Sequence, residues 1–198
     1  MGAACLVVSD GMPLVWMLRA QGHRLAERVY GPGLTRTLCR SAAQHGVSVF
    51  LYGGSTSEEL QLFITHMREF APGLEIAGAL CPPLLPVTPP FDVEVVRVIN
   101  DSGARLVFVG LGCPKQENWM LMHLGSLDAI TVGVGLAFAQ IAGTKPTAPR
   151  WMQLAGLEWL FRLAQEPGRL WRRYLVGNSL FVWYCLQDFI KRIDAIRR

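Results

Sequence analysis

The sequence predicts an α/β fold of the Rossmann-like type, a parallel sheet with helices on both faces, followed by a C-terminal helical appendage. Short apolar runs alternate with segments whose apolar residues recur at helical spacing. Strands that are apolar on both sides are typical of a parallel sheet covered on two faces. No such run follows Pro149. With 51% hydrophobic residues in 198, the chain can also bury a substantial core.

Five apolar runs are predicted to form the strands. Each contains β-branched or aromatic residues or other large apolar side chains, and each is followed within two residues by glycine, proline or aspartate, which commonly end strands. The runs cover residues 4–9, 47–52, 74–80, 106–109 and 130–134. We therefore expect the described chain to start with a strand of the sheet.

Helices are predicted between the strands and throughout the C-terminal part. Residues 31–44 and 91–101 have apolar residues at helical spacing, and Ser55 with Glu58 forms a capping box in front of a third helix. Residues 151–165 and 168–190 are predicted as two further helices, separated by Pro167–Gly168.

Positive charge is concentrated at the C-terminal end of the chain. Residues 1–144 carry 9 basic and 11 acidic side chains, whereas residues 145–198 carry 10 basic and 4 acidic ones, a net charge of +6. This asymmetry favours a polyanionic partner, and nucleic acid, anionic lipid and a diphosphate all remain open on charge alone.

The cysteines and the hydropathy pattern indicate the compartment. Five scattered cysteines without a C-x-x-C pair suggest neither a disulfide framework nor a zinc site, which fits a reducing cytoplasm. The longest uncharged stretches, residues 129–144 and 174–187, are shorter than the roughly 20 apolar residues of a membrane-spanning helix. No charged segment of a secretory signal precedes the first apolar run.

Three polar clusters follow predicted strands, at the place where open parallel α/β sheets bind ligands. Because the carboxyl ends of parallel strands lie at one edge, we expect the clusters to converge. They are Asp10–Gly11, the run Gly53, Gly54, Ser55 and Thr56, and the run Gly110, Leu111, Gly112, Cys113, Pro114, Lys115, Gln116 and Glu117.

The last of these clusters is the most informative. Its glycines permit close backbone approach, Pro114 suits the first turn of a helix, and free N–H groups at such a helix start favour an anion. Lys115 would add a positive charge for a phosphate. Taken alone, an ordinary strand-to-helix turn is the better explanation, just as helix capping explains Gly53–Gly54 and a turn explains Asp10.

Common catalytic motifs are absent from the sequence. It contains no P-loop, G-x-G-x-x-G, G-x-S-x-G or H-E-x-x-H, which excludes the usual nucleotide-hydrolase, dinucleotide and hydrolase assignments. A D-x-D metal motif is also absent. Asp92–Glu94 comes closest, but its position at the start of an amphipathic helix favours an interaction with the helix dipole over a cation site.

Read in order, the later motifs resemble the WecG/TagA/CpsF family of glycosyltransferases. The resemblance spans nearly the whole chain, since Asp10–Gly11 and Gly53–Gly54 also fit. Its segments are Gly110–Glu117, Val132–Gly135, Ala137–Phe138, Ala142–Gly143, Ala148–Gln153, Gly156–Arg162, Glu166–Pro167, Arg169–Leu170 and Arg172–Tyr174.

The resemblance implies an inverting, metal-independent hexosyltransferase with no cofactor. Such an enzyme moves a sugar, often of the N-acetylmannosamine type, from a UDP-sugar to an undecaprenyl-diphosphate-linked saccharide during synthesis of cell-surface polysaccharide. It would work on the cytoplasmic face of the plasma membrane as a peripheral protein. Residues 1–148 would form the nucleotide-sugar-binding catalytic domain, and residues 149–198 a basic helical appendage that docks on an anionic membrane surface.

Four departures from the family pattern affect this interpretation. Family members usually carry a further segment, with a Thr-Asn pair, before the strand that ends in Asp-Gly, so we expect the catalytic domain to lack its N-terminal part. Leu136 stands where a small residue is common, Ala139 replaces a frequent Asp, and Thr147 replaces a frequent Arg. Each substitution is expected to affect donor choice or activity.

Inverting transfer needs a base for the acceptor hydroxyl and positive groups for the departing diphosphate. Asp10 is the candidate base. The resemblance and the strand-end positions together make the donor-binding candidates Gly53, Gly54, Gly110, Gly112, Pro114, Lys115, Gln116, Glu117, Gly135 and Arg162. Arg169, Arg172 and Arg173 share one helix face beside apolar residues and are candidates for a lipid headgroup or diphosphate.

Two other functions fit parts of the sequence. A nucleic-acid-binding module would use the basic tail, but the aromatic residues there lie among aliphatic ones and form no spaced stacking platform, so we expect no nucleic-acid partner. A catalytically inactive or truncated relative with a binding or structural role is the alternative that Ala139 and the expected N-terminal difference support.

Overall fold

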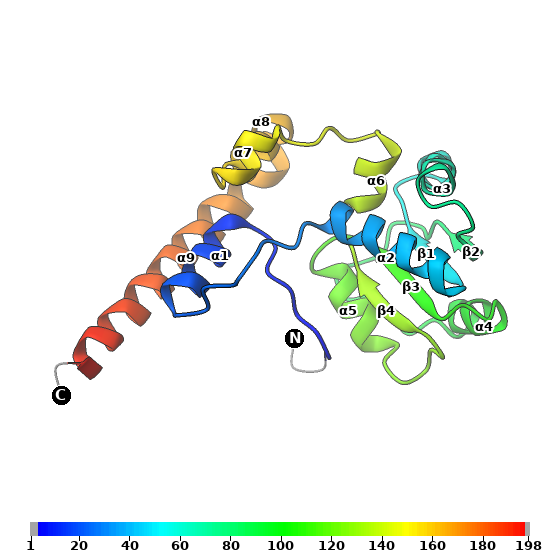
Figure 1. Ribbon diagram of the computed structural model, residues 1–198, viewed down its shortest axis with the longest axis horizontal. Coiled ribbons are helices and arrows are strands. Elements are labelled where there is room, and N and C mark those ends of the chain that lie inside the picture. Colours follow the sequence, from blue (N-terminus) through cyan, green and yellow to red (C-terminus); the bar gives the residue numbers. More distant parts are fainter. Residues whose placement is uncertain (1–3, 197–198) are drawn as a thin grey trace. The chain divides into compact units, whose positions relative to one another are not determined.

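The structure, a computed structural model, describes residues 4–196, without the side chains at positions 169, 173, 182, 186 and 188–196. The described residues form two compact units (Figure 1). The sheet unit comprises Val29–Thr147 with the short stretch before residue 9, and the helical unit comprises Ser9–Arg28 with the chain from Ala148 onward.

Four parallel strands form the centre of the sheet unit. They are β1 (Val49–Gly53), β2 (Ile76–Leu80), β3 (Leu106–Gly110) and β4 (Ile130–Gly133), in the order β2-β1-β3-β4. Five helices accompany them, α2 (Gly31–His45), α3 (Ser57–Phe70), α4 (Val93–Asp101), α5 (Lys115–Met122) and α6 (Ala137–Ala142). The predicted α/β, Rossmann-like class is confirmed by this parallel sheet.

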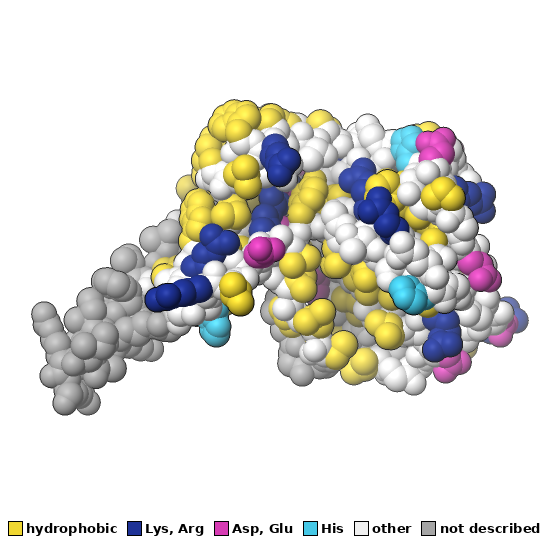
Figure 2. Space-filling model, viewed as in Figure 1, with side chains coloured by type: hydrophobic (Ala, Val, Ile, Leu, Met, Phe, Trp, Pro, Cys, Tyr) yellow, Lys and Arg dark blue, Asp and Glu magenta, His cyan; other side chains and the backbone are white. Residues whose placement is uncertain are grey.

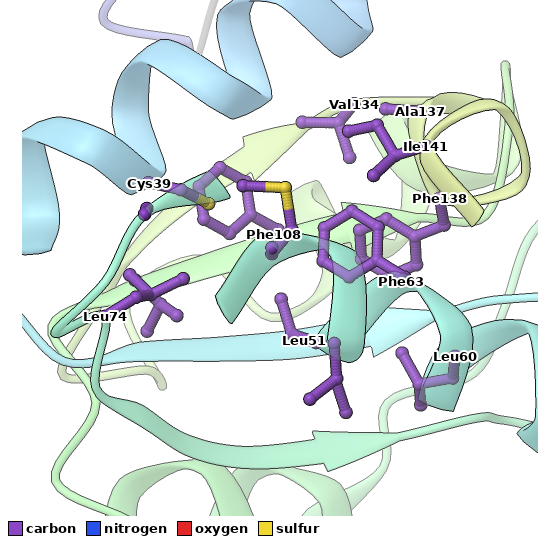
Figure 3. Packing of buried hydrophobic residues seen from close by; sticks show 14 of the residues in the cluster. Cys39, Leu51, Leu60, Phe63, Leu74, Phe108, Val134, Ala137, Phe138 and Ile141 are labelled. Carbon is purple, nitrogen blue, oxygen red and sulfur yellow. The ribbon is translucent and has the colours of Figure 1, made fainter. Parts of the chain in front are cut away.

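Alternation of side chains along the strands supplies two cores, one on each face of the sheet. Leu51 and Phe108 point to the face where Phe63 of α3 packs on Phe138 of α6, with ring centroids 4.5 Å apart (Figure 3). Tyr52 and Val109 point to the opposite face. Strands that are apolar on both faces therefore lie between two helical layers, as the sequence predicts.

The second face is built around a column of aromatic rings. The ring centroid of Trp119 in α5 lies 4.5 Å from that of Tyr52 and 4.4 Å from that of His123. The ring centroids of His123 and Phe91 are 5.0 Å apart. The buried imidazole has partners for both nitrogens, because Nδ1 lies 2.8 Å from the Trp119 carbonyl oxygen and Nε2 3.1 Å from the Asp92 backbone nitrogen. The column thereby joins α5 to the start of α4.

Two predicted helix starts can be compared with the structure. The predicted helix-dipole role at Asp92 is supported, because its carboxylate accepts hydrogen bonds from the backbone N–H groups of Glu94 and Val95 at 3.1 Å. The predicted capping box of Ser55 and Glu58 is wrong by one position. Thr56 is the N-cap of α3 and accepts from the backbone N–H of Glu59 at 3.2 Å.

The predicted strand at residues 4–9 is wrong. These residues have no regular secondary structure, and Leu6, Val7 and Val8 are exposed. Asp10 consequently does not follow a strand; it precedes Gly11, the N-cap of α1. An apolar run forms a strand only where a neighbouring strand pairs with its backbone N–H and C=O groups.

The helical unit contains α1 (Met12–Ala20), α7 (Arg150–Leu154), α8 (Glu158–Gln165) and α9 (Pro167–Ile196). The single helix predicted over 151–165 is thus two, with a break at Gly156, whose φ is 70°. A Cβ there would lie 2.9 Å from the Trp16 ring of α1. Pro167 and Gly168, which were predicted to separate two helices, instead form the first turn of α9. Proline is tolerated at this position of a helix.

None of the helices in residues 4–196 combines the length and the apolar composition that spanning a bilayer requires. Residues 9–28, which we assigned by sequence to the α/β domain, are grouped with the C-terminal helices. The functional division at residue 148 stays a prediction.

Candidate functional site

Two of the predicted clusters meet at the carboxyl edge of the sheet. Gly53 ends β1 and Gly110 ends β3, and the two residues are paired in the parallel register. A Cβ at Gly53 would lie 2.7 Å from the Gly110 carbonyl oxygen, and the φ of Gly53 is 149°. Gly53 is buried, and only glycine fits this approach without a shift of backbone, so the ends of β1 and β3 pack main chain against main chain.

Gln116 connects the start of α5 to the loop after β4. Its side chain is 7% exposed, and Oε1 accepts the Gly135 N–H at 2.8 Å while Nε2 donates to Glu117 Oε1 at 3.0 Å. Gly133 leaves room for this amide, since a Cβ there would lie 2.9 Å from Nε2. The predicted residues Gln116, Glu117 and Gly135 therefore form one hydrogen-bonded group.

The other predicted residues of the segment lie at the same helix start. Gly112 has a φ of 76° and its carbonyl oxygen accepts the Gln116 N–H at 3.0 Å. Pro114 is the N-cap of α5, and Lys115 is the first helical residue and is half-buried. Main-chain N–H groups and a lysine at a helix start suit an anionic group such as a diphosphate.

A second network fixes the loop that contains Gly54. Glu59 is buried, its Oε1 accepts the Ser55 N–H at 2.9 Å, and its Oε2 accepts the Thr144 hydroxyl at 2.5 Å. Gly54 itself has a φ of 96°, and the Cys81 thiol lies 3.6 Å from its carbonyl oxygen. The loop after β1 is thus tied to the residues that follow α6.

In the helical unit, Asp10 lies beside Arg28, a residue that the sequence analysis did not identify. Arg28 Nη2 is 3.4 Å from Asp10 Oδ1 and forms a closer ion pair with Glu158 Oε2. Arg28 Nη1 also donates to Gln153 Oε1 at 3.3 Å. No local pattern marks Arg28, because its partners lie on helices far along the chain.

The surroundings of Asp10 favour its protonated form. Loss of hydration is the largest cause and raises its pKa above the ordinary value of 3.8, and the Glu158 charge acts in the same direction. Arg28 and Arg162 lower the pKa. The side chain stays 61% exposed, so water still screens these charges. A carboxylate with a raised pKa is a stronger base, as a proton acceptor requires.

The predicted tail arginines differ in their surroundings. Arg162 Nη2 pairs with Glu158 Oε1 at 2.8 Å, while the Arg172 guanidinium lies 5.6 Å from the Trp171 ring centroid and is exposed. The side chains of Arg169 and Arg173 lie outside the described residues. Figure 2 shows hydrophobic side chains over α7 and α8 with basic side chains next to them.

The predicted convergence of three clusters is confirmed for two, the Gly53 and Gly110 groups. For Asp10 the reasoning was wrong, because it rested on a strand end that the structure lacks. Among the described residues, no group of three or more His, Cys, Asp or Glu side chains is arranged to hold a metal ion.

The positions where the sequence departs from the family pattern lie around α6. Leu136 is the N-cap of this helix, and Thr147 is exposed in the segment after it. Ala139 is buried, and its carbonyl oxygen accepts the Thr144 and Lys145 N–H groups at 3.0 and 3.1 Å. A larger residue at 139 would therefore need space inside a packed layer.

Comparison with known proteins adds the following findings. The model of a family described as "Glycosyl transferase WecG/TagA/CpsF family" matches residues 1–195. A relative from Bacillus subtilis (strain 168), an N-acetylglucosaminyldiphosphoundecaprenol N-acetyl-beta-D-mannosaminyltransferase, is 30% identical over 171 residues, which are 85% of this chain and 64% of the relative. A protein of the same name from Bacillus spizizenii is 32% identical over 177 residues, or 88% and 66%. The chain thus spans just under two thirds of the length of these relatives.

Proposed function

Because this chain belongs to the WecG/TagA/CpsF family of glycosyltransferases, we propose that it transfers a sugar from a UDP-sugar to an undecaprenyl-diphosphate-linked saccharide. The observation that carries this proposal is the family match over residues 1–195. Both relatives are named for the transfer of N-acetylmannosamine to lipid-linked N-acetylglucosamine. These names support an N-acetylmannosamine-type donor and a role in bacterial cell-surface polysaccharide synthesis.

Donor binding is assigned to the carboxyl edge of the sheet unit. Gly53 and Gly110 hold the ends of β1 and β3 close together, and the start of α5 that follows β3 offers N–H groups and Lys115 for the diphosphate. Negative charge that develops on the departing UDP is stabilised by such fixed positive groups. We propose that the reaction needs no metal ion or other cofactor.

Asp10 is proposed as the general base. Its carboxylate takes the proton of the acceptor hydroxyl while that oxygen forms a bond to C1 of the sugar. The bond between C1 and the diphosphate oxygen breaks, and UDP leaves with the electron pair. Attack from the face opposite the leaving group inverts the configuration at C1. The raised pKa of Asp10 supports this assignment, because it strengthens the base.

Docking on the inner face of the plasma membrane is proposed for the helical unit. Its exposed aromatic side chains include Trp16, Trp151, Trp171, Trp183 and Tyr184, residue types that anchor proteins at membrane interfaces. The net charge of +6 over residues 145–198 adds attraction to anionic lipid. The acceptor is itself lipid-linked under this proposal, so docking would bring the base to the acceptor.

The proposal is tested with Asp10→Asn and radiolabelled UDP-N-acetylmannosamine, using a lipid-diphosphate N-acetylglucosamine acceptor. Turnover should fall by about 10²-fold or more, whereas UDP affinity by calorimetry should stay near wild type. Asp101→Asn, an exposed carboxylate at the end of α4, is the matched control and should keep full turnover. No transfer by the wild-type chain from this or any related UDP-sugar would refute the proposed activity.

A further inference from the structure

The Arg28 side chain is the centre of a charged network inside the helical unit. It is 12% exposed, and it contacts acceptors from three places in the unit, namely Asp10, Gln153 of α7 and Glu158 of α8. Gln153 is in turn held by the Ala148 carbonyl oxygen, which accepts from its Nε2 at 2.8 Å. A guanidinium fixed on several sides can orient a neighbouring carboxylate with little loss of side-chain entropy.

The contacts of Arg28 are unequal. The contact with Glu158 is the closest, and the contact with Asp10, at 3.4 Å, is long for a charge-assisted hydrogen bond. Glu158 is 15% exposed and uses both oxygens, one for Arg28 and one for Arg162. Glu158 therefore competes with Asp10 for two positive charges, and in this structure it holds both more closely.

This inequality matters for a proton acceptor. An arginine that binds a carboxylate closely stabilises its ionised form and makes it a weaker base. An arginine held elsewhere can orient one oxygen of the carboxylate and leave its basicity largely intact. The second arrangement is the one around Asp10.

We propose that Glu158 is a positioning residue for Asp10: it holds Arg28 and Arg162 so that Arg28 orients the Asp10 carboxylate without binding it tightly. This inference rests on the proposed function, in which Asp10 is the base. Glu158 is far from Asp10 in sequence, and it acts on Asp10 through the two arginines that it holds.

The electrostatic effects on Asp10 agree with this arrangement. The charged groups that act on it are Arg28, Glu158 and Arg162, and after loss of hydration they are the remaining causes of its changed pKa. The Glu158 charge raises this pKa and the two arginines lower it. Removing the Glu158 charge withdraws the first effect and also releases Arg28 toward Asp10. Both changes lower the pKa.

The test variant is Glu158→Gln, which keeps the size of the side chain and removes its charge. The acidic limb of the kcat/KM profile reports a base that must be ionised, so it should move to lower pH. Turnover on the plateau should fall by about threefold to tenfold because the base is weaker, whereas UDP affinity should stay unchanged. Glu158→Asp, which restores the charge, should return the limb toward its wild-type position.

A second readout does not need activity. Carbon-13 NMR of chains labelled at the aspartate carboxyl groups follows the titration of Asp10, whose signal is identified by its loss in Asp10→Asn. Its midpoint should fall in Glu158→Gln and rise in Arg162→Gln, because the Arg162 charge lowers the pKa. Glu94→Gln is the matched control, since Glu94 pairs with Arg97 at 2.7 Å on an exposed surface of the sheet unit.

The outcomes separate the two proposals. An Asp10 midpoint that stays constant or rises in Glu158→Gln overturns the role of Glu158, whatever the activity. If Glu158→Gln does not fold, the opposite shift expected for Arg162→Gln decides the question, and no shift there counts against the network. A wild-type chain that transfers no sugar defeats the proposed function, while the NMR titration still decides how Glu158 acts on Asp10.

Discussion

Tyr52 shows how burial at a single position in the sheet changes the pKa of a side chain. It is 2% exposed in β1 and stacks on Trp119, and burial, followed by the nearby Asp92 charge, raises its pKa from the ordinary value of 10.0 to about 12. The folded chain therefore binds this proton more tightly than the unfolded chain does.

The stabilisation by neutral Tyr52 should accordingly depend on alkaline pH. It is complete below pH 10, where the unfolded tyrosine keeps its proton, and it is lost as the pH rises from 10 toward 12. Between pH 10 and pH 12, the unfolding free energy of Tyr52→Phe should therefore fall by about 2–3 kcal/mol less than that of the wild type. Urea unfolding at a series of pH values measures it, with the exposed Tyr184→Phe as control. Equal alkaline losses in wild type and Tyr52→Phe would contradict the prediction.

The residues missed by the sequence analysis share one property. Arg28 stands in no motif, and Glu158 lies in a family segment from which only Arg162 was selected, while the pairing of Arg28 with Glu158 spans 130 positions. Gln116 and Gly135 were found because strand ends and the family motifs mark them. Local spacing thus identifies residues on one loop, whereas an ion pair between remote segments depends on tertiary packing that no local pattern contains.

At the scale of the element, the start of α3 shows that the kind of motif can be predicted more reliably than its register. Ser55 and Thr56 can both cap a helix, and Glu58 and Glu59 can both close the box. The structure selects Thr56 and Glu59, because Glu59 points inward to Thr144 while Glu58 is exposed. The choice is made by the contact of Glu59 with Thr144, in the segment that follows α6 on the same face of the sheet.

Paired alanine substitutions should separate the two possible caps. Thr56→Ala removes the acceptor for the Glu59 N–H and should cost about 0.5–2 kcal/mol of unfolding free energy. Ser55→Ala should cost less than about 0.5 kcal/mol, because Ser55 contacts Glu59 through its backbone N–H. Chemical denaturation measures both, and a larger loss in Ser55→Ala would restore the register that the sequence suggested.

The errors in secondary structure have physical causes of the same kind. Residues 4–9 have strand-like composition but no strand beside them, and the helix breaks after α7 because Gly156 adopts a left-handed φ of 70°. The four strands of the sheet were predicted within a few residues because β1 and β3 are buried on both faces, and apolar side chains of the edge strands β2 and β4 pack against the same cores. An apolar composition indicates that a segment will be buried, but it does not identify the strand or helix that the segment packs against.

For the whole molecule, we predict that UDP binds without a divalent metal. The phosphate-binding groups that we assign are N–H groups and Lys115, which carry positive charge themselves. Calorimetric titration of UDP should give the same affinity, within about twofold, with EDTA and with added Mg²⁺. Lys115→Met should weaken binding in both buffers. Binding that disappears on chelation would refute metal-independent recognition.

Membrane docking should depend on charge and on salt. Neutralising Arg169, Arg172 and Arg173 to Gln should weaken binding to anionic vesicles by about 1 kcal/mol per charge at low salt, and much less at high salt. Vesicle co-sedimentation measures this, and Arg36→Gln with Arg40→Gln, on α2 of the sheet unit, is the control. Equal sedimentation of the triple variant and the wild type at low salt would mean that the three arginines do not bind the membrane and instead face solvent or bind substrate.

The discontinuous make-up of the helical unit has a consequence for how the chain is made. Ser9–Arg28 is synthesised before the sheet unit, but Gln153 and Glu158, which hold Arg28, follow 125 and 130 positions later. During translation the sheet unit can complete its core while Ser9–Arg28 still lacks these partners. The Asp10 network would therefore assemble only after α8 has been synthesised, later than the core of the sheet unit.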